Sequence, residues 1–293
     1  MPITPEERER RRSSVGGSDI AAILNLSPFA NAHDVYLEKV VGTEDGSSRA
    51  MTLGNDCEPM LVQWAHEQER PEAMLEVDKR LEKVLDWENG KQVKCHANLD
   101  GLMILGSERV GIEAKTSSMY DVFGEDGTDE IPDHVILQCQ WQIWIADLKE
   151  VVVPVLSADG GLQRKLYRVV PNEDLLKKCQ HAAMNFWNNH VVLGVPPEEV
   201  APSLDTLSRL KREPESVVDI SGEIVRKWLV ARQELGEAAK AEKEAKAELL
   251  ASLGTAEGGT CELGMLTYMQ QTRKAYEAKE STFRVARWKA VKK

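Results

Sequence analysis

The sequence predicts an α/β fold, with a mixed, mainly antiparallel central sheet flanked by helices and with a C-terminal helical arm. Three observations predict it. Apolar residues at helical spacing before residue 70 give way to runs of strand character between residues 74 and 116. Helical and strand patterns then alternate as far as residue 192. A proline-rich stretch at 194–216 finally precedes a charged, alanine-rich segment.

These patterns divide the 293 residues into three parts. We expect a compact domain at 1–193, a linker at 194–216, and a helical arm with a short β segment and a basic tail at 217–293. Residues 1–12 are highly charged, so we expect them to be a poorly packed lead-in.

Helices are expected where capping residues precede apolar residues at helical spacing. Ser18 is expected to cap the first of them, which Ser27-Pro28 ends. The helical segments are 18–24, His33–Val40, Asp56–Gln68, His134–Leu148 and Asp174–Val192. Trp141 and Trp144 lie at helical spacing beside isoleucines, which favours core packing over base stacking.

Strands are expected where β-branched and alternating residues follow turn chemistry. Glu88-Asn89-Gly90 and Gly106-Ser107-Glu108 supply such turns and would join the first three strands as hairpins. The strand segments are Met74–Val84, Val93–Leu105, Val110–Thr116, Val151–Leu156 and Lys165–Val170.

The C-terminal part begins with a long charged segment at 223–253. Its Glu and Lys side chains are spaced for i,i+4 pairs and it has little apolar surface, which indicates a solvated helical arm or one half of a helical hairpin. We expect a turn-rich break at Gly254–Gly264 and then a strand at Met265–Gln271 leading into the basic tail.

Composition sets weaker limits. The net charge of -11 argues superficially against a nucleic-acid partner, but basic residues cluster at 8–12 and after residue 273, so the total decides little. The five cysteines form no CxxC pair, which indicates a reduced, cytoplasmic protein without disulfides, a zinc ribbon or an iron–sulfur cluster. No apolar run is long enough to span a membrane, and the charged N-terminus is unlike a signal peptide.

The residues that point to chemistry lie on two neighbouring strands. Asp100 is on one, and Glu113 and Lys115 share one face of the next, because side chains alternate along a strand. A hairpin would bring two carboxylates and an ammonium together, which suits Mg²⁺-dependent phosphodiester hydrolysis. The alternative from spacing alone is a half-exposed hairpin with a surface Glu–Lys pair.

Five sequence blocks in a fixed order resemble one family. Asp100…Glu113-Ala-Lys115 is similar to the PD-(D/E)xK nuclease signature, with Leu99 where that motif has proline. The blocks around it resemble the YqaJ-like viral recombinase family, which includes lambda exonuclease. They are Arg11-Arg-Ser-Ser-Val-Gly-Gly-Ser-Asp, Leu53-Gly-Asn-Asp-Cys-Glu-Pro59, Ala97-Asn-Leu-Asp-Gly101, Ile112-Glu-Ala-Lys-Thr116 and Ile131-Pro-Asp-His…Leu-Gln-Cys-Gln-Trp-Gln142. The resemblance spans residues 11–156 and leaves the linker and the C-terminal third uncovered.

The resemblance implies a restriction-endonuclease-like core and a role for each matched residue. Asp100, Glu113, the carbonyl of Ala114 and Glu58 would bind metal, with Mg²⁺ as the expected ion and Mn²⁺ able to substitute. Lys115 would be the catalytic lysine, and Gln138 would position the water or the lysine. The residues implied for binding a terminal 5′-phosphate are Arg11, Arg12 as its near-equal substitute, Ser18 and Asn98, with backbone N–H groups of the Gly16-Gly17-Ser18 turn beside them.

Several of these residues also have plainer interpretations. Ser18 could be only a helix N-cap, and Glu58 only an acid at a helix N-terminus. Gln138 and Gln142, four apart, could simply line the polar face of a helix. The histidines show no paired spacing; His96 and His134 stay as outside candidates because they flank matched blocks.

The implied activity is 5′→3′ hydrolysis of duplex DNA from 5′-phosphorylated ends, in phage-type recombination by single-strand annealing. The same resemblance implies a homotrimer, an annealing protein as partner, and a phage or prophage gene expressed in a bacterial host cell. Alternatives are a structure-selective or restriction-like endonuclease, and a non-catalytic DNA-binding or assembly protein on the same fold. The arm leaves open a protein whose main task is interaction.

Overall fold

The computed structural model describes residues 5–44, 46, 48–87, 90–118, 122–158, 161–198, 200–210 and 215–272, with side chains from residue 9 onward. The chain divides into two compact units, Met1–Lys211 and Arg212–Lys293. In the part of the chain so described, no helix combines the length and the apolar character needed to cross a membrane.

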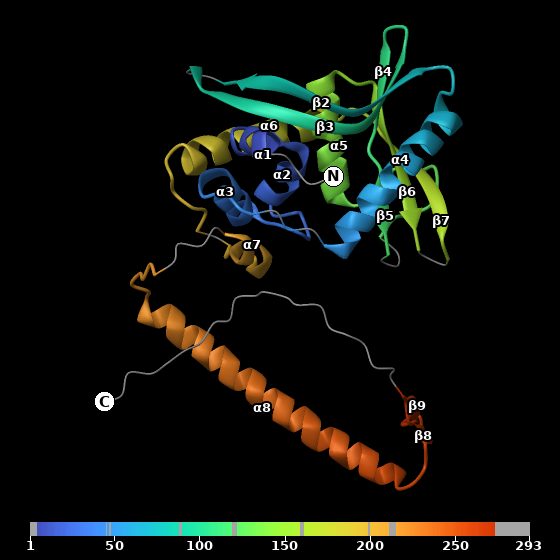
Figure 1. Ribbon diagram of the computed structural model, residues 1–293, viewed down its shortest axis with the longest axis vertical. Coiled ribbons are helices and arrows are strands. Elements are labelled where there is room, and N and C mark those ends of the chain that lie inside the picture. The colour runs from blue at the N-terminus through green and yellow to red at the C-terminus, as the bar shows by residue number, and fades with distance from the viewer. Residues whose placement is uncertain are drawn as a thin grey trace. The chain divides into compact units, whose positions relative to one another are not determined.

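A mixed seven-stranded sheet organises the first unit (Figure 1). β3 pairs antiparallel with β2 and β4 and parallel with β1, while β6 pairs parallel with β4 and β5 and antiparallel with β7. The strands are β1 (Val15–Gly16), β2 (Met74–Asp86), β3 (Gln92–Leu105), β4 (Glu108–Ile112), β5 (Lys115–Ser117), β6 (Glu150–Ser157) and β7 (Gln163–Val169). The predicted α/β class is confirmed. The expectation of mainly antiparallel pairing missed the parallel pairs at the centre, where a crossover through a helix requires them.

Helices cover both faces of this sheet. The helices of the first unit are α1 (Pro5–Arg12), α2 (Gly17–Ile23), α3 (Ala32–Val40), α4 (Arg49–Glu69), α5 (Asp133–Ala146), α6 (Glu173–Phe186), which continues as the π-helical segment η2 (Trp187–Val191), and α7 (Leu204–Arg209). α5 packs through Cys139 and its neighbours against one face of β6, which includes Val153, and α4 packs through Val62 against the other, which includes Val152. The alternation of buried valines along β6 is what a strand covered on both sides requires.

A second stripe of α5 completes the packing near the N-terminus. Leu137, Trp141 and Ile145 lie in one buried cluster with Ile20 of α2 and Cys95 of β3. Trp141 is fully buried there, as predicted for a core anchor. α5 is therefore held from the sheet side and from the α2 side, which fixes the polar residues that it carries between these two stripes.

Three predictions on local structure were wrong. Residues 5–12 form a helix and are not a lead-in, since Arg12 donates to the carbonyl oxygens of Lys39 and Val40 at the end of α3. Ser18 is not an N-cap: Gly16 takes that position, and the Asp19 carboxylate accepts a hydrogen bond from its N–H. The expected strand Val110–Thr116 is broken after Ile112.

The second unit is described by itself. It contains the long helix α8 (Gly222–Leu253), on which no residue is buried, and an antiparallel hairpin of β8 (Gly258–Cys261) and β9 (Gly264–Thr267). β8 lies inside the segment expected to be a turn-rich break, and β9 is shorter than the strand expected at Met265–Gln271. The basic tail from residue 273, like the turn residues 88 and 89, lies outside the described residues.

Candidate active site

The hairpin of β3 and β4 sets Asp100 opposite Glu113. Gly101 pairs with Ile112, so the next step of the same antiparallel register joins Asp100 and Glu113. Here the second strand ends, and β5 begins at Lys115 with β6 as its partner. The Asp100 carboxylate accepts a hydrogen bond from the backbone N–H of Ala114 at 2.7 Å. A side chain thus satisfies the backbone at the point where the strand breaks.

Glu113 is buried, at 3% exposure, and polar side chains surround its carboxylate. Its Oε1 accepts hydrogen bonds from Lys115 Nζ at 2.5 Å and Gln138 Nε2 at 2.7 Å. Its Oε2 accepts one from Gln142 Nε2 at 2.5 Å. Lys115 also donates to Gln138 Oε1 at 3.2 Å. The carboxylate, ammonium and two amides come from a strand end and one face of α5.

Further acids lie beside this network. Burial raises the pKa of Asp100 well above its ordinary value, with Glu113 and Glu58 as the next causes. Glu58, in the middle of α4, has a raised pKa because of burial and the nearby charges of Glu113 and Asp78. The negative charges therefore outnumber the single ammonium of Lys115, whose own pKa is raised because Glu113 and Asp100 outweigh the opposing effect of burial.

Asp78 has an unusual backbone. It lies on β2 between Val77 and Lys79, which pair with Gly101 and Leu99, so it stands opposite Asp100. Its φ is +49°, in the left-handed region that non-glycine residues seldom adopt. Asp78 is itself exposed, and a strained acid opposite Asp100 is typical of a functional position.

The donor chemistry fits a hard divalent cation, although the side chains do not enclose one as they stand. Among the described residues, no three acids, histidines or cysteines converge closely enough to hold a metal ion. The reason is that Glu113 directs both oxygens at amide and ammonium donors. The raised pKa values of Asp100 and Glu58 nevertheless reflect unbalanced negative charge, which a cation bound by carboxylate oxygens would relieve.

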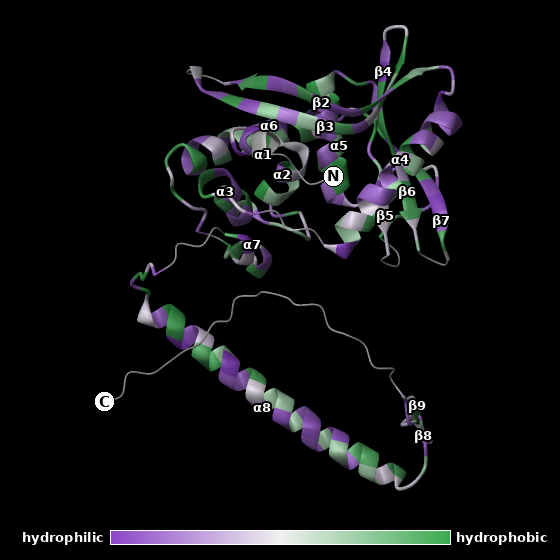
Figure 2. Cartoon of the chain, viewed as in Figure 1, coloured by the Kyte–Doolittle hydropathy of each residue, from purple (hydrophilic) through white to green (hydrophobic). Residues whose placement is uncertain are grey.

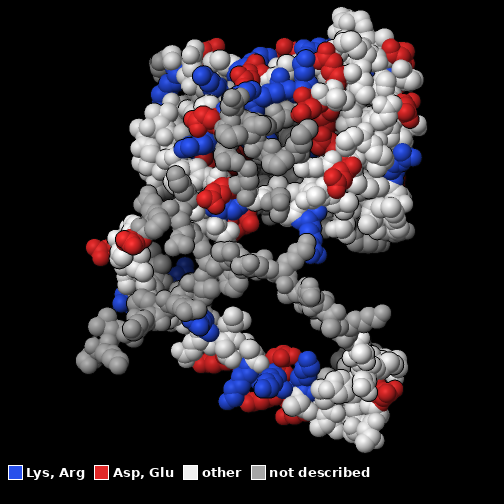
Figure 3. All heavy atoms as spheres, viewed as in Figure 1, with Lys and Arg blue, Asp and Glu red and all other residues white. Residues whose placement is uncertain are grey.

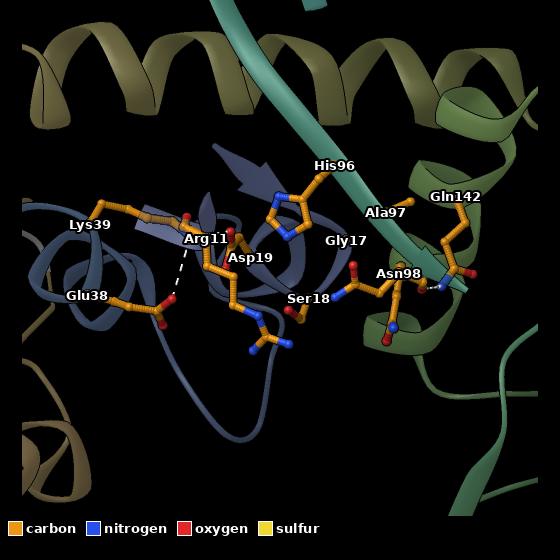
Figure 4. A pocket seen from close by; sticks show the side chains of 11 residues that line it. Arg11, Gly17, Ser18, Asp19, Glu38, Lys39, His96, Ala97, Asn98 and Gln142 are labelled. Atoms are coloured by element: carbon orange, nitrogen blue, oxygen red, sulfur yellow. Dashed lines mark hydrogen bonds and ion pairs between the residues drawn. The ribbon is translucent and has the colours of Figure 1, made fainter. Parts of the chain in front are cut away.

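A cavity of about 100 Å³ adjoins the carboxylates. Arg11 of α1, Ser18 of α2 and Asn98 of β3 line it, and Figure 4 shows their polar groups turned toward the same space. Gln138 and Gln142 line it as well, so the cavity and the acidic network share two side chains.

Arg12, the near-equal substitute for Arg11, lies outside this lining and binds carbonyl oxygens of α3. Lys39 and Asp19, which also line the cavity together with Glu38, form a buried ion pair at 2.7 Å. His96 also lines the cavity; its Nδ1 is 2.8 Å from Ser14 Oγ, and burial lowers its pKa to about 4. His134 stands apart from the cavity lining, in edge-on contact with the ring of Phe29.

The structure therefore brings Asp100, Glu113, Lys115 and Gln138 together, with Glu58 close enough to affect their charges. It separates Arg12 and His134 from the cavity. The plainer interpretation of Glu58 is wrong, since α4 begins at Arg49 and places Glu58 well inside the helix. Gln142 and Asp78 were missed. The i,i+4 spacing from Gln138 could have found Gln142, but the strand period gives no sign of the backbone at Asp78.

The fold and this site define an α/β domain with an acidic centre and a polar cavity beside it. Residues 8–149 match the family model described as the YqaJ-like viral recombinase domain. The predicted family is confirmed. An uncharacterized protein of Bacillus subtilis (strain 168), YqaJ, is 23% identical over 278 residues, covering 85% of this chain and 78% of that protein.

Solved structures similar to this chain include an alkaline exonuclease and a putative exonuclease. An alkaline exonuclease from Laribacter hongkongensis is 15% identical with a TM-score of 0.49, covering 66% of this chain and 94% of its own. A putative exonuclease from Eubacterium rectale is 13% identical with a TM-score of 0.45, covering 76% and 99%.

Proposed function

We propose that this protein is a Mg²⁺-dependent 5′→3′ exonuclease of double-stranded DNA that acts in phage-type recombination. The observation that carries the proposal is the joining of two features: the acids and lysine at the end of β4, and the cavity lined by Arg11, Ser18 and Asn98. The match of residues 8–149 to the YqaJ-like viral recombinase model supports a nuclease.

The spacing of these features favours action at a DNA end. Asn98 and Asp100 are two residues apart on β3, about 7 Å along the strand. A terminal 5′-phosphate held by Arg11, Ser18 and Asn98 would leave the first internal phosphodiester near the acids. A guanidinium and hydroxyl are suitable donors for a phosphate.

Each side chain then has a task in hydrolysis. Asp100 and Glu113, with the carbonyl of Ala114 and with Glu58 nearby, would hold Mg²⁺, which polarises the scissile phosphate and makes bound water more acidic. Lys115 stays protonated, because its pKa is raised, and neutralises charge that develops on the phosphate. Gln138 contacts both Lys115 and Glu113 and would orient the attacking water.

The products that this hydrolysis would give allow the enzyme to act repeatedly at one DNA end. Water attacks phosphorus, a new P–O bond forms, and the bond to the 3′-oxygen of the terminal nucleotide breaks. That nucleotide leaves as a 5′-mononucleotide, and the shortened strand again ends in a 5′-phosphate. The other strand remains as a 3′ overhang, which a single-strand annealing protein would bind. A homotrimeric ring around the DNA would keep the enzyme on its substrate.

The test is digestion of linear duplex DNA with and without a 5′-phosphate, in Mg²⁺. We expect Lys115→Ala to lower the rate by about 10²–10⁴-fold, because a charged group at the reacting phosphate is lost. Lys149→Ala is the matched control: this lysine is exposed and pairs with Glu108. Unchanged activity of Lys115→Ala would contradict the catalytic assignment.

Two further substrates separate the alternatives. Arg11→Ala should remove most of the preference for a 5′-phosphorylated end, and a wild type indifferent to that phosphate would contradict the phosphate pocket. Covalently closed circular DNA should stay intact, whereas an endonuclease would cut it. A non-catalytic DNA-binding protein would bind the linear duplex and leave every substrate whole.

A further inference from the structure

Gln142 lies one turn after Gln138 on α5 and is 1% exposed. Its side-chain nitrogen donates to the carbonyl oxygen of Asn98 at 3.0 Å (Figure 4). The same nitrogen donates to Glu113 Oε2 at 2.5 Å. An amide nitrogen has two protons, so both are used. The opposite orientation of the amide would turn an oxygen toward two acceptors, which fixes the orientation.

The two oxygens of Glu113 are held differently. Lys115 and Gln138 both donate to Oε1, whereas in the described part of the chain Gln142 is the one side chain that donates to Oε2. Without Gln142, rotation of the carboxylate about its last torsion would be resisted by the contacts at Oε1 alone. Gln142 thus adds the restraint on where the second oxygen points.

Stability alone does not explain this glutamine. Its side-chain oxygen Oε1 is buried and has no hydrogen-bond partner among the described residues. Leaving a buried acceptor unsatisfied costs about 1–3 kcal/mol. A buried glutamine that carries this free-energy cost beside an acidic site is better explained by the two groups to which its nitrogen donates, the Asn98 carbonyl and Glu113.

We propose that Gln142 is a positioning residue, which fixes Glu113 relative to the β3 backbone at Asn98. The side chain of Asn98 lines the cavity, so the same link sets the distance between the cavity and the acids. This inference rests on the proposed function, since Glu113 is taken there as a metal-binding acid.

The chain offers a matched control in Gln140. It lies on the same helix, is 2% exposed, and makes two hydrogen bonds of its own, to the Val170 carbonyl at 2.7 Å and from the Asn172 N–H at 2.9 Å. Neither partner is near Glu113. Gln142→Met and Gln140→Met remove a buried amide of the same size, and only the first touches the site.

We expect Gln142→Met to lower the maximal rate on 5′-phosphorylated duplex by about 10–100-fold, with a smaller effect on KM. The rise in melting temperature that Mg²⁺ produces in the full chain should also shrink. Gln140→Met should lower the melting temperature yet keep the wild-type rate and response to Mg²⁺. The inference fails if Gln142→Met keeps both, or if both variants lose both equally. Should wild type digest no DNA, the proposed function fails, and the response to Mg²⁺ still tests Gln142.

A separate observation concerns the exposed apolar residues of α8 in the second unit. Positions alternately four and three apart along it form one stripe, which is the repeat of a coiled coil. The stripe consists of Ile224, Trp228, Ala231, Leu235, Ala238, Glu242, Ala245, Leu249 and Ser252. Its large members are exposed: Ile224 and Leu235 at 70%, Leu249 at 51% and Trp228 at 40%. Figure 2 shows apolar and polar residues interleaved along the helix.

The charges of α8 are segregated along its length. Residues 223–232 contain Glu223 and three basic residues, a net charge of +2, whereas residues 234–248 contain five glutamates and three lysines, a net charge of -2. Side chains of both signs are visible along the arm in Figure 3. This order opposes the helix dipole, so it does not stabilise an isolated helix. It is complementary to the same helix running the other way.

We infer that α8 pairs with α8 of a second copy in an antiparallel coiled coil. In the register that overlaps the helices almost completely, Trp228 faces Ala245 of the second copy, Leu235 faces Ala238, and Ile224 faces Leu249. Large residues meet small ones in two of the three Ala layers, which favours close packing, and in the third layer Ala231 faces Glu242 of the second copy. Lys227, beside the stripe, would then lie next to Glu248 of the second copy.

Sedimentation of the full chain tests this pairing. We expect Leu235→Glu to lower the particle mass of the full chain, because it places two further charges in the paired stripe while preserving helix propensity. Val230→Glu, on an exposed position off the stripe, should leave the mass unchanged. Lys227→Glu should weaken association, and adding Glu248→Lys should restore it. Equal masses for wild type and Leu235→Glu overturn the inference, as does an equal fall in mass for Val230→Glu.

Discussion

The first unit holds two groups of inward-facing charges, which differ in how those charges balance. Asp19 pairs with Lys39 at 2.7 Å, and Lys39 also lies 3.7 Å from Glu38 and donates to the carbonyl oxygen of Arg11. Burial alone would raise the pKa of Asp19, but Lys39 and the Gly16 N–H together lower it. At the other group Asp100, Glu113 and Glu58 share one ammonium, and the pKa of Asp100 is raised.

This difference separates a structural ion pair from a binding site. The Asp19–Lys39 pair is satisfied within the fold, so it needs no further ion. The acidic group has more negative charge than its own fold neutralises, which is what we expect of the proposed cation-binding site. Perturbed carboxyl groups of this kind are typical of functional sites.

The largest expected effect on stability is at the balanced pair. Lys39→Met should lower the free energy of unfolding by about 3–5 kcal/mol, because Asp19 would be left buried without its countercharge. Urea denaturation measures the change. Lys149→Met, which removes an exposed lysine, should change stability by less than about 1 kcal/mol. An equally small loss for Lys39→Met would show that the pair is not structural.

At the acidic group we expect the opposite effect on stability: removing the charge of Asp100 should stabilise the fold. Because the folded pKa of Asp100 lies above its unfolded value of 3.8, this group loses stabilising free energy as pH rises from 3.8 through the folded pKa. Asp100→Asn keeps an oxygen for the Ala114 N–H and removes the charge. Without Mg²⁺, the variant should melt above wild type at pH 8 and level with it near pH 4.

Adding Mg²⁺ gives a second measurement of the difference between Asp100→Asn and wild type. The ion should stabilise wild type at pH 8 and narrow its gap from Asp100→Asn, since it binds the charged carboxylate. A variant that melts below wild type at every pH would mean that the acid is held by favourable contacts, as Asp19 is.

The smallest expected effect is at Asp78. Asn tolerates the left-handed backbone as well as Asp does. Asp78→Asn therefore removes one negative charge without changing the strain, and should stabilise the chain by about 0.5 kcal/mol in the absence of Mg²⁺. Differential scanning calorimetry at low and high salt gives the result. A gain that persists in high salt would exclude charge repulsion as its cause.

Much of the fold could be predicted because strand and helix periods differ clearly in this chain. The long strands β2 and β3 and the helix α5 lie within a few residues of their predicted positions. The break between Ile112 and Lys115 could not be predicted, because it depends on which strand each half pairs with. α4 begins seven residues before the predicted Asp56, since Ser48 caps it through its side chain.

The residues of the site likewise differ in whether the sequence could predict their positions. Spacing on neighbouring strands left a surface Glu–Lys pair as an alternative, and the family resemblance favoured a joint site of Asp100, Glu113 and Lys115. Gln142 faces Glu113 only because α5 crosses the sheet at this point, and Asp78 reaches the acids through register with Asp100. Contacts between elements far apart in sequence decide both, and no local period encodes them.

The hydrogen bond from the Ala114 N–H to Asp100 gives this acid a structural role in the sheet in addition to its proposed catalytic role. An apolar residue at position 100 would leave that N–H without its partner at a strand break, whereas Asn would still accept its proton. Among the described residues, the side chain of Lys115 makes no comparable hydrogen bond with the backbone. Descendants of this gene that have lost the reaction should therefore keep Asp or Asn at position 100 long after position 115 has drifted.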